Sequence, residues 1–282
     1  MRLVLTLLVR DEEDILRANL EYHLSQGVDF VLVTDNGSVD RTVGILKEYE
    51  RLGVVRLIHE PSDDYSQARW VTRMARLACI DHEADWIINS DADEFWWSET
   101  GTLKSVLEAV ADSDDLVVVP RSNFVPRPPG EGNLFQRMVV REAHSCNALG
   151  DPLPPKVCHR ASPEVQVAQG NHSISGGTGL RVAEEPRLLI FHFPLRTYRQ
   201  FERKIRSGGA AYERNRELTY EDGITWRHLY RELLAGRLPS YYESQMLGDA
   251  EIRKGIAEGR LLVDRRLHDY LLSLEPRIAS EP

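Results

Sequence analysis

The first 120 residues alternate short apolar runs with longer segments in which apolar side chains recur at helical spacing. The apolar runs are rich in leucine and β-branched residues, which is typical of buried strands. The longer segments have the pattern of amphipathic helices, and the alternation indicates βαβ units on a parallel sheet. The predicted strands are Leu3–Val9, Phe30–Asp35, Val54–Glu60, Asp85–Asp91 and Leu116–Pro120, and the predicted helices are Asp14–Gly27, Ser38–Gly53 and Tyr65–Glu83.

The pattern changes after residue 120. Prolines gather between residues 124 and 163, which predicts loops with antiparallel strands. A later apolar run, Leu188–Pro194, predicts another strand, and the spacing of apolar positions over Ile224–Gly236 predicts a helix. We therefore expect an α/β half at residues 1–120, a second half of the same domain at 121–196 and a helical extension at 197–282.

The composition is that of a folded chain with an acidic balance. At 282 residues and 42% hydrophobic content, the chain can bury a sizeable core. Lys and Arg total 35 against 44 Asp and Glu, which gives a formal net charge of -9. This balance argues against broad electrostatic attraction to nucleic acid or to anionic membranes.

The cysteines and the first residues bear on where the protein resides. The three cysteines stand far apart and none belongs to a CxxC pair, so a reducing cytoplasm fits best. The apolar run Leu3–Val9 meets Arg10 and Asp11 instead of a small-residue cleavage site, which predicts a buried strand and not a signal peptide. No uninterrupted apolar stretch approaches the roughly 20 residues that a membrane helix needs. We therefore expect a cytoplasmic protein without an integral membrane segment.

An acidic turn follows the predicted strand that ends at Asp91. Because successive strand residues face opposite ways, Asp91 and Asp93 are expected to point toward one cation, with Ala92 leaving the space between them clear. Two carboxylates together with ligand phosphates are a typical arrangement for Mg²⁺ or Mn²⁺. Ligands of open α/β sheets bind at the carboxyl ends of strands, where Asp35 also lies. A solvated turn is the ordinary alternative.

Two other segments carry residues suited to a phosphorylated ligand. Asp35 ends a strand and precedes a helix, so it is placed to accept hydrogen bonds from a sugar hydroxyl or a base edge, unless it only closes a βα turn. Arg69, Arg73 and Arg76 recur at helical spacing before the acidic strand, and the arginine fork suits phosphate. A solvated helix face is the alternative, chiefly for Arg73 and Arg76.

The order of these motifs resembles the nucleotide-sugar half of family 2 glycosyltransferases. The runs "LVRDEED", "VTDNGSVDRT", "SQARW" and "INSDADEF" correspond to that family's Tyr-Asn-Glu-like, Asp-Asp-Gly-Ser, Ala-Arg-Asn and Asp-x-Asp motifs, with Arg10 and Asn36 as departures. The resemblance covers residues 1–120. It implies a GT-A fold, which is a Rossmann-like α/β fold with a mostly parallel sheet and flanking helices. By the same resemblance the donor-binding residues are Val9, Arg10, Asp11, Asp35, Arg69, Asp91 and Ala92, and the metal ligands are Asp91 and Asp93.

The later run "LLIFHFPLRTYRQFERKIRSGG" is similar to a motif found in a subset of these enzymes. The similarity implies that His192 reaches the metal or the diphosphate, with Arg196 and Lys204 near the phosphates. A histidine at a strand end can complete an oxygen-rich site, and cations beside a developing diphosphate stabilise its charge. A histidine bonded only to backbone is the ordinary alternative.

The stretch Gln169–Gly177 lies where the family places its acceptor-side base. Inverting transfer needs a group that takes the acceptor's proton, and His172 has a suitable intrinsic pKa. The family more often uses a carboxylate, and this stretch contains none. The nearest substitutes are Glu184 and Glu185, followed by Asp151, and a plain glycine-rich loop is the alternative.

Glu94 is the second candidate catalytic residue, after His172. On an extended strand it would face away from Asp93, so it either anchors the turn or meets the acceptor. Neither role follows from the sequence alone.

These features together predict a metal-dependent, inverting glycosyltransferase of the hexosyltransferase type that uses Mn²⁺ or Mg²⁺ and a UDP-sugar. The acceptor is a small molecule, a glycan or a peptide, and a homodimer is left open. A nucleotidyltransferase on a similar sheet is one alternative, although it would want a glycine-rich basic loop where "VRDEED" is acidic. A catalytically idle nucleotide-sugar-binding protein is the other.

Overall fold

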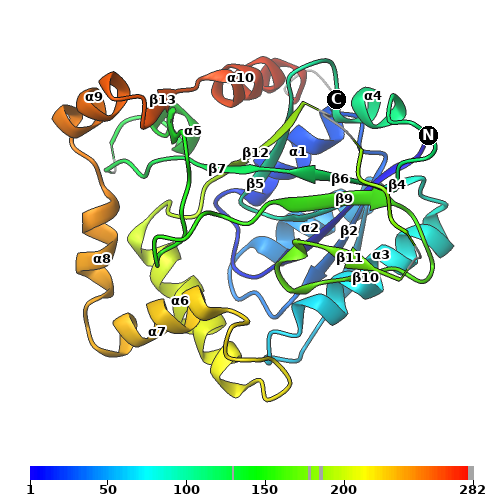
Figure 1. Ribbon diagram of the computed structural model, residues 1–282, viewed down its shortest axis with the longest axis horizontal. Helices are drawn as coiled ribbons and strands as arrows, with labels where there is room; N and C mark the ends of the chain where they lie inside the picture. The colour runs from blue at the N-terminus through cyan, green and yellow to red at the C-terminus, as the bar shows by residue number, and fades with distance from the viewer. Residues whose placement is uncertain (129, 177–178, 184–186, 279–282) are drawn as a thin grey trace. The chain divides into compact units, whose positions relative to one another are not determined.

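The computed structural model describes residues 1–128, 130–176, 179–183 and 187–278 (Figure 1). The chain forms two compact units, and each consists of several segments. The first unit contains Met1–Arg121, Leu153–Ile190 and Ala211–Gly223. The second contains Ser122–Pro152, Phe191–Ala210 and Ile224–Pro282.

A six-stranded sheet, in the order β3-β2-β1-β4-β9-β6, forms the centre of the first unit (Figure 1). Neighbours among the first four strands of this order pair in parallel, while β9 runs antiparallel to both β4 and β6. The expected α/β class with a mostly parallel sheet is therefore confirmed. The strands are β1 (Leu3–Val9), β2 (Phe30–Asp35), β3 (Val55–His59), β4 (Trp86–Asp91), β6 (Leu116–Val119) and β9 (Lys156–Arg160).

Helices pack onto this sheet through the apolar faces that the sequence predicts. On α3 (Gln67–His82), Val71, Met74 and Ala78 lie on one face and are fully or almost fully buried. They share a core cluster with Val4 and Leu32 of the two adjacent strands. Burying each large aliphatic side chain contributes about 1.5–3 kcal/mol, so this face holds the helix to the sheet. The other helices of the unit's N-terminal part are α1 (Leu16–Ser25), α2 (Thr42–Arg51) and α4 (Leu103–Glu108).

The carboxyl ends of three neighbouring strands meet at one edge of this sheet. In the parallel register Val9 stands beside Asp35, and Leu8 stands beside Asp91. This is the edge at which open α/β sheets bind their ligands. The expected placement of Asp35 and Asp91 on a common edge is confirmed.

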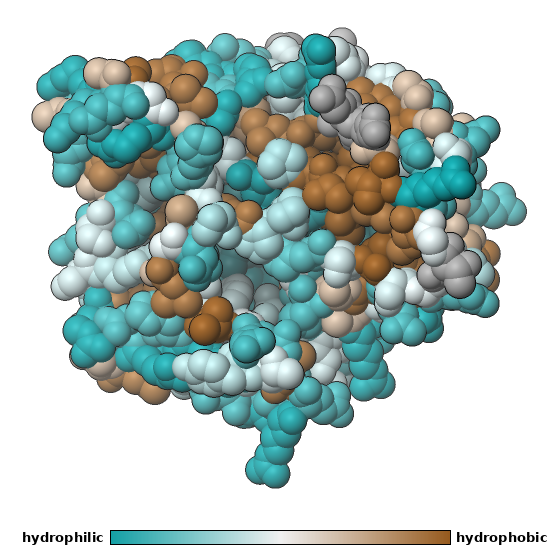
Figure 2. Space-filling view, in the orientation of Figure 1, coloured by the Kyte–Doolittle hydropathy of each residue, from teal (hydrophilic) through white to brown (hydrophobic). Residues whose placement is uncertain are grey.

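The region with many prolines supplies the antiparallel strand β9, and a short hairpin follows it in the chain. A two-stranded hairpin of β10 (Gln166–Val167) and β11 (Ile174–Ser175) flanks the short helix η1 (Gln169–Asn171) and contacts α3. At the far edge of the sheet, Figure 2 shows apolar side chains gathered over β6, where Val118 and Val182 are exposed.

The second unit is mainly helical beyond residue 196, as the sequence predicts. Its apolar core includes Phe201, Leu229 and Tyr242. Two short strands, β8 (Val140–Glu142) and β13 (Leu261–Val263), pair in antiparallel fashion. The helices in this unit are α5 (Leu134–Arg137), α7 (Ile224–Leu234), α8 (Leu238–Gln245), α9 (Asp249–Ala257) and α10 (Arg266–Ile278).

Four elements lie at the points where the chain passes between the units or leaves the acidic turn. They are β5 (Glu94–Ser98), β7 (Arg121–Asn123), β12 (Leu188–His192) and α6 (Tyr198–Arg214). Strand β12 confirms the late strand expected at residues 188–194. Helix α6 has 17 residues, and within the described parts of the chain no helix combines the length and apolarity needed to cross a membrane.

Candidate active site

The acidic turn joins β4 to β5 and is fixed from two sides. The backbone N–H of Asp91 donates to Glu94 Oε2 at 3.2 Å. The buried Asn19 side chain of α1 donates to the carbonyl oxygens of Ala92 at 3.0 Å and Glu94 at 2.8 Å. Strand geometry ends at Asp91, and Asp93 lies in the turn, so strand alternation is not what orients the Asp93 side chain. The turn itself holds the carboxylates at the sheet edge.

A buried lysine reaches this turn from β9. Lys156 Nζ lies 2.5 Å from Asp91 Oδ2 and 2.9 Å from Glu94 Oε2, and no part of the Lys156 side chain is exposed. Arg121 Nη1 lies 3.3 Å from Glu94 Oε1. Burial raises the pKa of Glu94, and the charges of Lys156 and Arg121 oppose that rise. Glu94 therefore anchors the turn, and its side chain has no exposed surface with which to meet an acceptor.

The sequence interpretation missed Lys156 because 65 residues separate it from Asp91. The available signal is weak: a single lysine opens the short buried strand, before Val157 and Cys158. A lysine inside a buried strand needs a counter-charge, which is a reason to search for a carboxylate partner.

His172 is held in one tautomer near the acidic turn. Its Nδ1 lies 2.8 Å from the Pro155 carbonyl oxygen, so Nδ1 carries the proton and Nε2 is left as an acceptor. Burial, followed by the charge of Lys156, lowers the pKa of His172 to about 4, and Asp91 is close enough to oppose this shift. The imidazole is therefore neutral at pH 7.

Gly170 permits the position of that ring. Its φ is +77°, and a Cβ at this residue would lie 2.4 Å from His172 Nε2. Both the backbone conformation and the close approach therefore favour glycine.

Asp35 closes the turn after β2. Its carboxylate accepts from the backbone N–H groups of Gly37 at 3.2 Å and Ser38 at 3.2 Å, and its side chain is 1% exposed. His59 Nδ1 lies 3.6 Å from Asp35 Oδ2. The Asp35 carboxylate therefore closes the βα turn, which is the alternative to ligand binding that the sequence left open. A role of Asp35 in ligand binding stays a prediction.

The loops after β1 and β2 are tied together by polar contacts. The Val39 N–H donates to Asp11 Oδ1 at 2.7 Å, and the Asp11 N–H donates to Ser38 Oγ at 2.9 Å. Arg10 Nη1 donates to Asn36 Oδ1 at 3.4 Å. These contacts bring the first two family-like motifs side by side.

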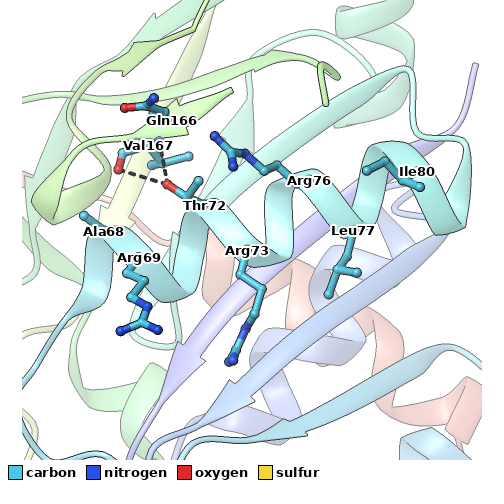
Figure 3. A pocket seen from close by; sticks show the side chains of 9 residues that line it. All are labelled: Ala68, Arg69, Thr72, Arg73, Arg76, Leu77, Ile80, Gln166 and Val167. Atoms are coloured by element: carbon cyan, nitrogen blue, oxygen red, sulfur yellow. Dashed lines mark hydrogen bonds between the residues drawn. The ribbon is translucent and has the colours of Figure 1, made fainter. Parts of the chain in front are cut away.

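The three arginines of α3 have different surroundings (Figure 3). Arg73 lies 3.3 Å from a carboxylate oxygen of Glu60, and Arg76 Nε donates to the Val165 carbonyl at 2.9 Å. In the described part of the chain Arg69 makes no hydrogen bond or ion pair. Figure 3 shows Arg69 and Arg73 on the side of the helix away from Gln166. Arg69 is therefore the arginine of this group that is available to a ligand.

A small recess opens beside Arg69. It has a volume of about 160 Å³ and combines two arginines, two serines and two carboxylates with one indole ring. This lining offers both donors and acceptors for hydrogen bonds. The lining residues are Glu60, Ser62, Asp64, Ser66, Arg69, Trp70 and Arg73.

Tyr65 is another residue that the sequence interpretation missed. Its φ is +53°, an unusual value for a residue with a side chain, and its ring centroid lies 4.6 Å from that of Tyr212. Burial raises the pKa of Tyr65 well above its usual value, and the negative charges of Asp91 and Asp93 add to the rise. The phenol stays protonated and stands among these carboxylates.

The C-terminal residues implied by the resemblance lie in the second unit. His192 Nδ1 is 2.7 Å from Asn123 Oδ1, and Arg196 Nη1 donates to the Phe193 carbonyl at 3.2 Å. Lys204 Nζ lies 6.0 Å from the centroid of the Trp226 ring. Their predicted meeting with Asp91 and Asp93 of the first unit stays a prediction.

The predicted carboxylate substitutes for the base stay predictions. Asp151 belongs to the second unit, where its backbone N–H donates to Asn147 Oδ1 at 3.1 Å in a local turn. Glu184 and Glu185 lie outside the described residues.

The carboxylates of Asp91 and of Asp93, which is 1% exposed, have the chemistry of ligands for a divalent cation that is bound partly through a substrate. Among the described residues no three His, Cys, Asp or Glu side chains gather into a metal site. Mg²⁺ and Mn²⁺ held against phosphates need only one or two carboxylates, because phosphates and water fill the remaining positions. Lys156 binds one oxygen of Asp91, whose side chain remains 33% exposed. The donor set is thus chemically suitable.

Residues 6–167 match the family model described as glycosyltransferase family 92. The match spans more than half of the chain and includes the acidic turn and Lys156. The chain belongs to glycosyltransferase family 92. The expected enzyme class, a glycosyltransferase, is confirmed, whereas the sequence motifs pointed to family 2. The family 92 assignment rests on a match over a continuous segment of the chain, whereas the resemblance to family 2 rests on short motifs and stays a prediction.

Several solved structures have a distant likeness to this family 92 chain. Staphylococcus aureus TarS 1-349 shows 11% identity and a TM-score of 0.43 over 98% of this chain and 92% of that chain. The same TarS fragment in complex with UDP-GlcNAc gives 11% and 0.43 over 92% and 93%. Glucosyl-3-phosphoglycerate synthase from Mycobacterium tuberculosis, in complex with Mn²⁺, UDP and phosphoglyceric acid, gives 16% and 0.31 over 43% of each chain. No curated protein sequence matches.

Proposed function

We propose that this family 92 protein transfers a hexosyl group, with inversion, from a UDP-sugar to a small-molecule, glycan or peptide acceptor. The observation that supports the proposal is the acidic turn at the ligand edge of the sheet, where the charge of Asp91 acts on the proposed base His172. We further propose that the reaction depends on Mn²⁺ or Mg²⁺.

Asp91 and Asp93 are the residues that would hold the cation, and His192 is proposed to join them. When bound, the cation would offset negative charge on the departing nucleotide. Arg196 and Lys204 are proposed to bind the diphosphate and to stabilise the charge that develops as the bond to the sugar breaks.

The nucleotide is proposed to lie along the ends of β1 and β2. Arg69 supplies a guanidinium group that makes no hydrogen bond or ion pair in the described structure, and Asp35 ends β2 at the ligand edge of the sheet. The Asp35 side chain is 1% exposed and closes the turn after β2, so its proposed contribution is to hold that turn in shape for the nucleotide. The remaining proposed donor contacts are Val9, Arg10, Asp11 and Ala92.

His172 is the proposed general base. Its Nε2 is unprotonated and would accept the acceptor's proton as the acceptor oxygen bonds to the anomeric carbon. The bond between that carbon and the diphosphate oxygen breaks in the same displacement, and the diphosphate leaves with the electron pair. Because a pKa of about 4 makes a weak base, fixed orientation must supply part of the rate.

The test replaces Asp93 by Ala and measures UDP release from a UDP-sugar with Mn²⁺ or with EDTA. We expect the wild type to be stimulated by Mn²⁺ and the variant to lose at least about 100-fold, the scale of removing a main transition-state stabiliser. Asp81→Ala is the matched control, because Asp81 is a half-exposed carboxylate paired with Arg56 on the surface of the first unit. Full activity of Asp93→Ala in EDTA would overturn the metal assignment.

One observation favours a second candidate, a nucleotide-sugar-binding protein without turnover. The low pKa of His172 makes its imidazole a weak base. Binding of UDP-sugars without release of UDP, under conditions with Mn²⁺ and varied acceptors, would support this candidate over the transferase.

A further inference from the structure

Lys156 has no exposed side-chain surface, yet it carries a charge. Burying an ammonium group is costly unless a counter-charge and hydrogen bonds compensate. Its Nζ meets that need through Asp91 at 2.5 Å and Glu94 at 2.9 Å. An apolar residue of similar length would pack at this place without either requirement, so stability alone gives little reason for a lysine.

The strand order explains how Lys156 reaches the turn. Strand β9 lies between β4 and β6, with Cys158 opposite Ile88 and Lys156 opposite Val119. Because β4 and β9 run antiparallel, the beginning of β9 lies beside the end of β4, where the acidic turn starts. The lysine therefore approaches the turn from within the sheet.

The two carboxylates that Lys156 contacts differ in what remains open to them. Glu94 is fully buried and is also contacted by Arg121 and by the Asp91 N–H. Asp91 keeps a third of its side chain exposed at the ligand edge. Lys156 thus holds one oxygen of a carboxylate whose remaining surface is exposed at the ligand edge of the sheet.

We propose that Lys156 is a positioning residue, which orients the Asp91 carboxylate for the cation and diphosphate of the donor while balancing the buried charge of Glu94. This inference rests on the proposed function. Residues that orient a metal ligand from behind typically affect metal affinity or activity by 10–100-fold when removed.

The experiment compares Lys156→Met with Lys104→Met. Lys104 forms the same kind of bond, at 2.7 Å to Asp29, but Asp29 precedes β2 at the opposite edge of the sheet. Calorimetric binding of UDP with Mn²⁺, together with kcat and KM for donor hydrolysis, is measured for both variants. We expect Lys156→Met to bind about tenfold more weakly and to turn over about 10–100-fold more slowly. Lys104→Met should match the wild type in both.

Two further variants separate positioning from folding. Lys156→Met with Glu94→Gln removes both buried charges, so it should fold even if Lys156→Met does not, and it should retain the binding and turnover defects. Lys156→Arg keeps a cation beside Asp91 and should recover part of both. A folded variant without Lys156 that binds Mn²⁺ and UDP as tightly as the wild type, or more tightly, overturns the inference. If the wild type itself shows no turnover stimulated by Mn²⁺, the proposed function fails instead.

Discussion

Two carboxylates, Asp264 in the second unit and Asp91 in the first, have cationic partners but differ in how much of the carboxylate the pairing leaves exposed. In the second unit, Asp264 is bound by Arg141 Nε at 2.7 Å and by Arg266 at 2.6 and 2.9 Å, and its side chain is 4% exposed. In the first unit, Asp91 shares one oxygen with Lys156 and is 33% exposed. A carboxylate whose oxygens are all engaged joins elements of the fold, whereas one that is partly engaged at a sheet edge retains capacity for a ligand.

The pKa values follow the same division. Burial acts to raise the pKa of Asp264, but hydrogen bonds from Arg266 and Arg141 outweigh it and lower that pKa. Around the acidic turn, burial dominates and raises the pKa of Glu94. Asp264 is thus stabilised as an anion by its partners, whereas burial raises the pKa of Glu94 despite the charges of Lys156 and Arg121.

The largest expected effects come from replacing Asp91 or Asp264 by Asn. Asp91→Asn keeps the shape but removes a charge at the ligand edge, so we expect kcat to fall by about 100-fold or more with a small change in melting temperature. Asp264→Asn leaves two arginines without a counter-charge, so we expect a loss of about 3 kcal/mol of unfolding free energy with kcat preserved in the folded enzyme. Denaturant titration and UDP release measure the two quantities. If Asp91→Asn instead lowers the unfolding free energy and Asp264→Asn instead lowers kcat, the comparison is wrong.

Acid should affect the two units in different pH ranges. Burial lowers the pKa of His23, His159 and His172 in the first unit to about 4, whereas in the unfolded chain these groups have a pKa of about 6.5. Between these values the unfolded chain binds protons that the folded chain does not, so stability falls as pH drops from about 6.5 to 4. Asp264 contributes stability above its unfolded pKa of about 3.9 and loses it only as pH falls through its lower folded pKa.

Hydrogen exchange, corrected for intrinsic rates, measures this difference at several pH values between 7 and 4. As pH falls from about 6.5 to 4, the free energy of opening measured for amides of β4 and β9 should fall by an amount on the order of a few kcal/mol. Amides of β8 and α10 should lose protection only at lower pH. Earlier loss of protection in the second unit would contradict the assignment.

The smallest expected effect concerns the ring of His172. Gly170→Ala would place a methyl group 2.4 Å from His172 Nε2 and also strain a residue with φ of +77°. Gly53→Ala is the matched control, because Gly53 has φ of +76° and open space around the added methyl group. Both variants should lose about 1 kcal/mol of stability from backbone strain, and only Gly170→Ala should also lower kcat, by roughly tenfold. Equal kcat values for the two variants would argue against His172 as the base.

Much of the first unit could be predicted from its sequence. The strands Leu3–Val9 and Phe30–Asp35 begin and end at the predicted residues, and the acidic turn follows its strand as expected. These features depend on local periodicity, which a single segment displays by itself. The helices begin later than predicted, as at Leu16 for α1, where the Ile15 N–H donates to the Glu12 carbonyl oxygen and closes a turn before the helix.

Local periodicity predicted fewer of the contacts within the candidate site. The prediction that Asp91 and Asp93 face one way assumed strand geometry, but the chain turns after Asp91. Lys156 and Tyr65 stand near the carboxylates because of long-range packing, and neither belongs to the motifs that the sequence displays. Motif order therefore identified the enzyme class but not the partners of its carboxylates.

The sequence by itself determined that parallel strands would bring Asp35 and Asp91 to one edge, since strand ends and periodicity are local properties. Only the tertiary structure decided that β9 enters the sheet beside β4 and delivers Lys156 to the acidic turn. Pairing between strands distant in sequence depends on the burial and hydrogen bonding of the whole sheet, and no single segment encodes it. The charge environment of the site is therefore a property of the fold.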